Sequence, residues 1–225
     1  MSAVIVFAPK GAPDDDDDPL VRTRWMADRT IERLADADVP TETVLDHNAT
    51  RAGLETVLSA EQEVAGLVML SHGRAGSIEP GRMVDDAVMG ADGPALDADN
   101  SALLHDRWGH AIACHAGTEL AARACQAGAV CFAGYDTALH VDWHPNELSD
   151  ELLPLLARLV TETSHRLAAC EFDHQALQRA VNDIADEIEA WCESQPDDAP
   201  EQMLVITAQQ FVERLVVRCR DAESP

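Results

Sequence analysis

Short apolar segments alternate with helical periodicity through residues 3–133, and this alternation constrains the fold more than any other feature of the sequence. Apolar runs of four to six residues, rich in β-branched side chains, predict buried strands, and polar–apolar alternation over residues 41–45 predicts a further strand. The predicted strands are residues 3–8, 41–45, 65–70, 110–113 and 129–133, and the predicted helices between them are 21–37, 51–60 and 118–126. Strands joined through helices indicate parallel pairing, so we predict an α/β fold with a three-layer, mostly parallel sheet.

The pattern changes after residue 145. Three apolar stripes at helical spacing follow, over residues 148–160, 172–188 and 203–217, and the last two are separated by Pro196 and Pro200. Such stripes predict amphipathic helices. We therefore expect two domains: an α/β domain over residues 1–145 and an all-helical extension over residues 146–225.

The charge of the chain is strongly acidic. Its 225 residues include 41 Asp and Glu but 16 Lys and Arg, which gives a formal net charge of −25, and Lys10 is the one lysine. We interpret the excess as a solvated acidic surface suited to a salt-rich, halophilic cytoplasm. Nucleic-acid partners are not expected, because the sequence has no basic cluster to contact a phosphate backbone.

Cysteine usage and hydropathy favour a reducing cytoplasm. The six cysteines are widely spaced and none forms a CxxC motif, so a disulfide framework is not expected. Cys125 and Cys131 lie on a predicted helix face and in a predicted strand, which suits core thiols. No apolar run approaches the ~18 residues of a membrane span, and no basic segment precedes the first apolar stretch. We expect no membrane partner.

Two residues capable of nucleophilic chemistry follow neighbouring predicted strands. His72 and Gly73 come directly after the third strand, and Cys114 comes after the fourth, before a predicted helix. Ligands of parallel sheets bind at the carboxyl ends of the strands. A histidine beside a cysteine can generate the thiolate, and the backbone N–H groups of Gly73 and Cys114 are candidate donors to an oxyanion.

These residues resemble the caspase-like cysteine peptidases, most closely their separase and CHAT branches. The resemblance rests on SHG at residues 71–73, ACHAG at 113–117 and AGAVCFAGY at 127–135, and it covers residues 3–139. The His–Cys interval of 42 residues is near the ~50 of caspases. His115 stands where these families often carry a small or polar residue, and residues 134–136 replace their tryptophan-containing motif.

The resemblance implies a cysteine endopeptidase of caspase-like fold. By this match Cys114 is the nucleophile and His72 the base, the substrate is a protein or peptide, and neither metal nor organic cofactor takes part. Acidic residues in nearby segments are candidates to line the substrate pocket and to favour a basic residue at the cleavage position. They are Asp85, Asp86, Asp97, Asp99 and Asp136.

Other interpretations stay open. An inactive caspase-like interaction module would dock a partner protein through its helical extension, and a Rossmann-like sensor would bind a ligand at the strand ends without Cys114. A zinc site is less favoured, because Cys114 and the histidines around it lack a recognised zinc spacing. Nucleotide binding is also less favoured, since no GxGxxG or P-loop follows the first strand.

The net charge predicts that salt stabilises the protein. Dissolved ions screen the repulsion among the excess carboxylates, so the melting temperature should rise between ~0.1 M and ~2 M KCl. Thermal unfolding followed by circular dichroism at several KCl concentrations measures this. A melting temperature that stays constant or falls over that range would contradict the expectation.

Overall fold

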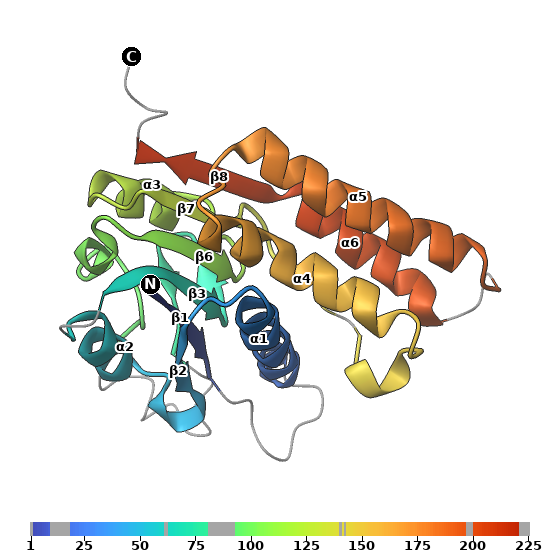
Figure 1. Cartoon of the computed structure of the whole chain (residues 1–225), viewed down its shortest axis with the longest axis horizontal. Coiled ribbons are helices and arrows are strands. Elements are labelled where there is room, and N and C mark those ends of the chain that lie inside the picture. The colour runs from blue at the N-terminus through green and yellow to red at the C-terminus, as the bar shows by residue number, and fades with distance from the viewer. Residues whose placement is uncertain are drawn as a thin grey trace.

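A six-stranded sheet forms the centre of the computed structural model, which describes residues 2–9, 19–60, 63–80, 93–139, 141, 143–196 and 200–220. The strand order is β2-β1-β3-β6-β7-β8 (Figure 1). The first five strands in that order pair in parallel, and β8 is antiparallel to β7. The strands are β1 Ala3–Ala8, β2 Thr41–Leu45, β3 Val64–Leu70, β6 Trp108–Ile112, β7 Cys131–Tyr135 and β8 Leu215–Cys219. A hairpin of β4 Gly73–Arg74 and β5 Ser77–Ile78 follows β3 directly.

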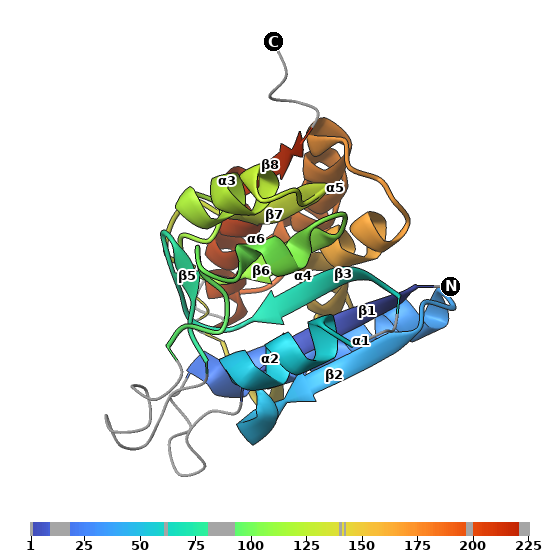
Figure 2. The same cartoon turned by 90° about the vertical axis from the view of Figure 1, so that its left-hand side faces the viewer.

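Helices cover both faces of the sheet (Figures 1 and 2). One face carries α1 Pro19–Asp36, α4 Leu153–Ala168, α5 His174–Glu193 and α6 Met203–Glu213. The other face carries α2 Arg51–Leu58 and α3 Glu119–Gln126. In the part of the chain that the structure describes, no helix has both the length and the apolar character needed to cross a membrane.

Side chains of each central strand alternate between two cores. In β1, Val4 and Val6 face the core under α1 and α4, whereas Ile5 and Phe7 face the core under α2 and α3. All six residues of β1 are buried. A strand covered on both faces has no position for a solvated side chain, which is why these strands are continuous apolar runs in the sequence.

The predicted α/β class and the mostly parallel sheet are confirmed, but the expectation of an all-helical extension is wrong at its end. The helix predicted over residues 203–217 ends at Glu213, and the chain then forms β8. Without β8, the backbone groups along the outer edge of β7 would have no strand partner. The β-branched Val216 and Val217 suit that position, so sheet pairing overrides the helical periodicity.

The C-terminal helices share a core with the sheet. The aromatic rings of Tyr135 on β7 and Phe211 on α6 pack edge to face, with centroids 5.1 Å apart. Beneath the sheet, Ser164 on α4 contacts His110 on β6. Residues after 145 therefore complete the core over one face of the sheet.

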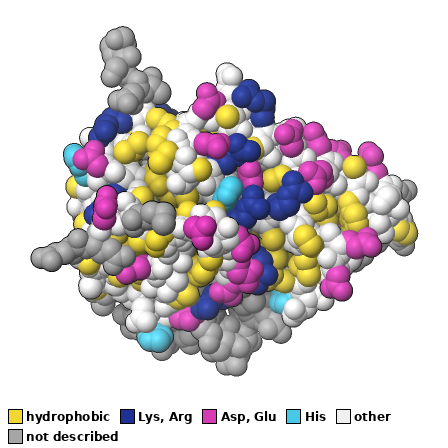
Figure 3. All heavy atoms as spheres, in the orientation of Figure 1, with side chains coloured by type: hydrophobic (Ala, Val, Ile, Leu, Met, Phe, Trp, Pro, Cys, Tyr) yellow, Lys and Arg dark blue, Asp and Glu magenta, His cyan; other side chains and the backbone are white. Residues whose placement is uncertain are grey.

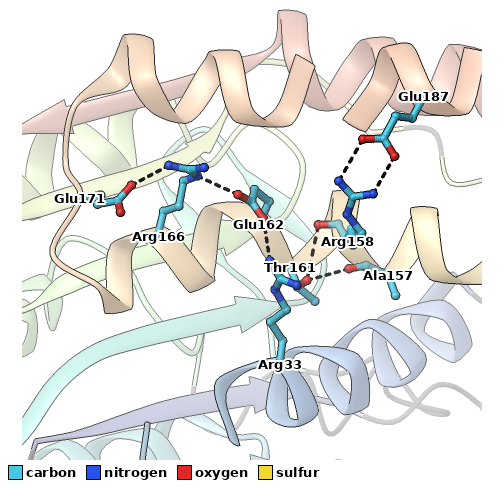
Figure 4. Close-up of polar contacts among 8 residues, drawn as sticks. All are labelled: Arg33, Ala157, Arg158, Thr161, Glu162, Arg166, Glu171 and Glu187. Atoms are coloured by element: carbon cyan, nitrogen blue, oxygen red, sulfur yellow. Dashed lines mark hydrogen bonds and ion pairs between the residues drawn. The ribbon is translucent and has the colours of Figure 1, made fainter. Parts of the chain in front are cut away.

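Arginines link the helices on this face through ion pairs. Glu162 on α4, whose side chain is only 9 % exposed, accepts hydrogen bonds from Arg33 on α1 at 3.0 Å and from Arg166 at 2.7 Å (Figure 4). Arg158 on α4 forms a two-bond pair with Glu187 on α5. Figure 3 shows arginines gathered over the middle of this face among acidic side chains. The arginines thus join α1, α4 and α5.

Removal of Glu162 should destabilise the fold more than removal of Glu187. Glu162→Ala leaves two partly buried guanidinium groups without their shared carboxylate, and we expect a loss of about 2 kcal/mol in the free energy of unfolding. Glu187→Ala breaks a more exposed pair and should cost less than about 1 kcal/mol. Urea unfolding of both variants at one salt concentration measures the difference, and equal losses would contradict this ranking.

Candidate active site

His72 and Cys114 follow paired strands at the same edge of the sheet. Strands β3 and β6 are parallel neighbours, with Leu70 opposite Ile112. The Ser71 N–H donates to the Ile112 carbonyl at 3.3 Å, so the pairing continues beyond the last strand residues. The predicted adjacency of these two strands is confirmed. His72 and Cys114 each lie two residues beyond the strand ends, and both are half-buried.

Gly73 brings the backbone beside His72 against the backbone of Cys114. A Cβ atom added at Gly73 would lie 2.5 Å from the Cys114 carbonyl oxygen, 3.2 Å from the Cys114 nitrogen and 2.8 Å from the Ala113 Cβ. Two of these neighbours are backbone atoms, which cannot rotate away. Only glycine fits this contact, which places the backbone that directly follows His72 against the backbone of Cys114.

The backbone of His72 is held by the β4–β5 hairpin that follows it. The His72 carbonyl accepts a hydrogen bond from the Glu79 N–H at 3.0 Å. The Ser71 hydroxyl donates to the Glu79 carbonyl at 2.7 Å. This hairpin was not predicted, because the Ala75–Gly76 pair at its turn is not one of the dipeptides that mark two-residue hairpin turns.

The segment after Cys114 is fixed from two sides. On the side of β7, His115 N–H donates to Thr137 and Gly117 N–H to Tyr135. On the side of the hairpin, Leu120 N–H donates to the Ala75 carbonyl at 2.8 Å. These bonds hold the loop between two elements of the structure.

Two backbone features allow this tight path. His115 has a φ of +59°, in the left-handed region that non-glycine residues rarely occupy. A Cβ atom added at Gly117 would lie 2.9 Å from the Gly134 carbonyl group, so the chain passes β7 with no room for a side chain. Unfavourable backbone geometry of this kind persists only where the surrounding structure enforces it.

The Cys114 thiol has a backbone donor beside it. The Leu139 N–H points at the Cys114 Sγ at 3.4 Å, so a backbone donor faces the sulfur. In the described residues, no backbone carbonyl accepts a hydrogen bond from the Cys114 N–H. The contribution of Leu139 was not predicted, because no local pattern connects it with Cys114.

The acidic candidates for a substrate pocket lie in different places. Asp85 and Asp86 lie outside the described residues. The Asp97 carboxylate pairs with Arg51 on α2 at 3.1 Å, and Asp99 is exposed beside a cavity of about 340 Å³ near α2. Asp136 lies next to the loop after Cys114, where its carbonyl oxygen is 3.3 Å from the Nδ1 of His115. Of the three described candidates, Asp136 is thus connected directly to this loop.

His110 is a structural residue beneath the site. It lies on β6, and its Nδ1 is 2.7 Å from the Ser164 hydroxyl oxygen, while its Nε2 is buried without a hydrogen-bond partner. Complete burial lowers the pKa of His110 to about 3, so its imidazole is neutral near pH 7. The ring is enclosed beneath the sheet, and its lowered pKa makes it a weak base, so His110 does not take the proton of Cys114.

The side chains around Cys114 were considered as metal ligands because several of them are histidines. Among the described residues, no group of three or more His, Cys, Asp or Glu side chains is placed to hold a metal ion. His140 lies outside the described residues, and His110 is hydrogen-bonded to Ser164. The zinc interpretation of the histidines around Cys114 therefore gains no support from the geometry.

Comparison with known proteins does not assign the chain to a family. No family model matches it, and no curated protein sequence matches it.

His110 predicts a loss of stability in acid. Its pKa is lower in the folded state than the ~6.5 of an unfolded chain, so the unfolded state binds the extra proton as pH falls below about 6.5. This group alone should remove up to about 1.4 kcal/mol of folding free energy per pH unit between pH ~6 and ~4. His110→Gln, which cannot take up that proton, should flatten this part of the stability curve. Urea unfolding from pH 4 to 7 measures both slopes, and parallel curves would contradict the assignment.

Proposed function

We propose that this chain is a cysteine endopeptidase that uses Cys114 as nucleophile and His72 as base. The observation that carries the proposal is the contact between Gly73 and the Cys114 backbone, which sets the His72 backbone beside Cys114 at the carboxyl edge of the sheet. The resemblance of SHG and ACHAG to caspase-like peptidases supports the same roles. We include membership of the caspase-like fold family in this proposal.

The chemistry follows from these roles. His72 takes the thiol proton, and the Cys114 sulfur attacks the scissile carbonyl carbon. The N–H groups of Gly73 and Cys114 donate to the oxyanion that forms. His72 then protonates the departing amine as the C–N bond breaks, and a water activated by His72 hydrolyses the thioester.

Substrate preference is part of the proposal. The exposed carboxylate of Asp136 follows β7, next to the loop after Cys114, and it would attract a cationic side chain. Repulsion would disfavour an acidic residue at the same position. We therefore assign a basic residue to the position before the cleaved bond.

An interaction module without catalysis is the second candidate. It is favoured by α6, where Met203 and Ile206 lie three residues apart and are 47 % and 48 % exposed. Residues at this spacing share one face of a helix. A partner protein could cover that face, and Cys114 would then be inert.

A covalent probe separates the two candidates. We expect a peptide acyloxymethyl ketone ending in arginine to label Cys114 selectively over Cys170, an exposed cysteine distant in the sequence, as mapped by mass spectrometry. His72→Ala should slow labelling and peptide turnover by about 10²- to 10⁴-fold. Cys114→Ala should abolish both with little change in melting temperature.

Two controls complete the experiment. His115→Asn removes the neighbouring imidazole but keeps a residue that tolerates positive φ, so it should label nearly as fast as the wild type. Peptides that differ only in Arg or Asp before the cleaved bond, compared at high salt, test the preference. Equal labelling of Cys114 and Cys170, together with no cleavage of any peptide, would favour the interaction module.

A further inference from the structure

Cys131 and Cys219 lie directly opposite each other on neighbouring antiparallel strands. They are partners in the register of β7 and β8. The next pair along, Val130 and Arg220, is joined by a hydrogen bond from the Arg220 N–H to the Val130 carbonyl at 3.1 Å. Since hydrogen-bonded and non-hydrogen-bonded pairs alternate, the cysteines form a non-hydrogen-bonded pair, whose Cα atoms are typically ~4.5 Å apart. This is the cross-strand position in which side chains approach most closely.

The two sulfur atoms are already in contact. The Cys219 thiol donates to the Cys131 sulfur, and the Sγ–Sγ distance is 2.9 Å. Both residues are thiols in this structure. A non-hydrogen-bonded pair falls within the Cα separations of ~4.4–6.8 Å that disulfides span. A covalent bond between these sulfurs therefore requires no rearrangement of the sheet.

The two thiols differ in access to solvent. Cys131 is fully buried, whereas Cys219 is partly exposed at the end of the edge strand. A cavity of about 510 Å³ opens nearby and is lined by Val130 and Phe172. The Phe172 carbonyl oxygen lies 3.4 Å from the Cys219 sulfur. The hydrogen bond with Cys219 and burial both raise the pKa of Cys131, so Cys219 is the thiol that meets an oxidant first.

We propose that Cys131 and Cys219 are an oxidative modification site that forms a cross-strand disulfide with hydrogen peroxide. The Cys219 thiolate attacks one peroxide oxygen, the O–O bond breaks, and hydroxide leaves with a proton as water. The resulting sulfenic acid is attacked by the Cys131 sulfur, the S–O bond breaks, and a second water is released. Two thiols are oxidised to one disulfide, and one peroxide is reduced to two waters.

The disulfide ties the last strand to the sheet. The two cysteines are 88 residues apart in the sequence, and the segment between them contains α4, α5 and α6. Closing so long a loop restricts the unfolded chain. β8 pairs with β7 alone at the edge of the sheet. The covalent bond would therefore link this edge strand to its one neighbouring strand.

The experiment uses the full chain, reduced, freed of reductant and treated with a small excess of hydrogen peroxide. We expect a non-reducing peptide map to link Cys131 to Cys219 and the intact mass to fall by two hydrogens. The melting temperature should rise by about 5–10 °C and return after reduction. Cys219→Ser, at the partly exposed position, should lose both the crosslink and the rise.

Neighbouring thiols supply matched controls. Cys125 lies close enough to contact the Arg218 carbonyl through its sulfur, and Cys170 lines the nearby cavity. Cys125→Ser and Cys170→Ser should both keep the Cys131–Cys219 crosslink. A disulfide through Cys125 or Cys170 would overturn the proposal, as would higher oxidation of Cys219 without any crosslink. Oxidation of Cys114 maps to a different peptide, so this test is independent of the proposed peptidase function.

Discussion

The parallel pairing of β3 with β6 is the constraint on which the rest of the structure depends. These strands lie at the centre of the sheet and are covered by helices on both faces. Their register places Leu70 opposite Ile112, so both strands end at the same level. This alignment places the β4–β5 hairpin after β3 and the loop after β6 at the same edge of the sheet.

The candidate site is held mainly by backbone contacts. Gly73 touches the Cys114 backbone, and Gly117 passes the backbone of Gly134 without room for a Cβ atom. Hydrogen bonds from the loop after Cys114 reach both the hairpin and the end of β7. Groups positioned by rigid backbone lose little entropy when they bind a substrate, which is the arrangement that nucleophilic catalysis requires.

The acidic composition gives the few cations a structural role. Arg33 connects α1 to α4, Arg158 connects α4 to α5, and Arg51 connects α2 to the loop that contains Asp97. Each of these arginines joins two different elements of the structure. In a chain with a net charge of −25, such pairs also relieve repulsion among the carboxylates that surround them.

The sequence by itself determined the local elements and the order in which they alternate. Continuous apolar runs predicted β1, β3, β6 and β7, because a strand buried on both faces must be apolar at every position, and alternation predicted β2. The same reasoning predicted that His72 and Cys114 follow neighbouring strands, since alternating strands and helices produce parallel neighbours. Only the tertiary structure decided contacts between distant segments. It placed residues 215–217, the end of a predicted helix, in β8, paired Asp97 with Arg51 and set Cys131 against Cys219. Hydrophobic periodicity indicates which side chains of a segment are buried. It does not indicate which distant segment of the chain packs against them.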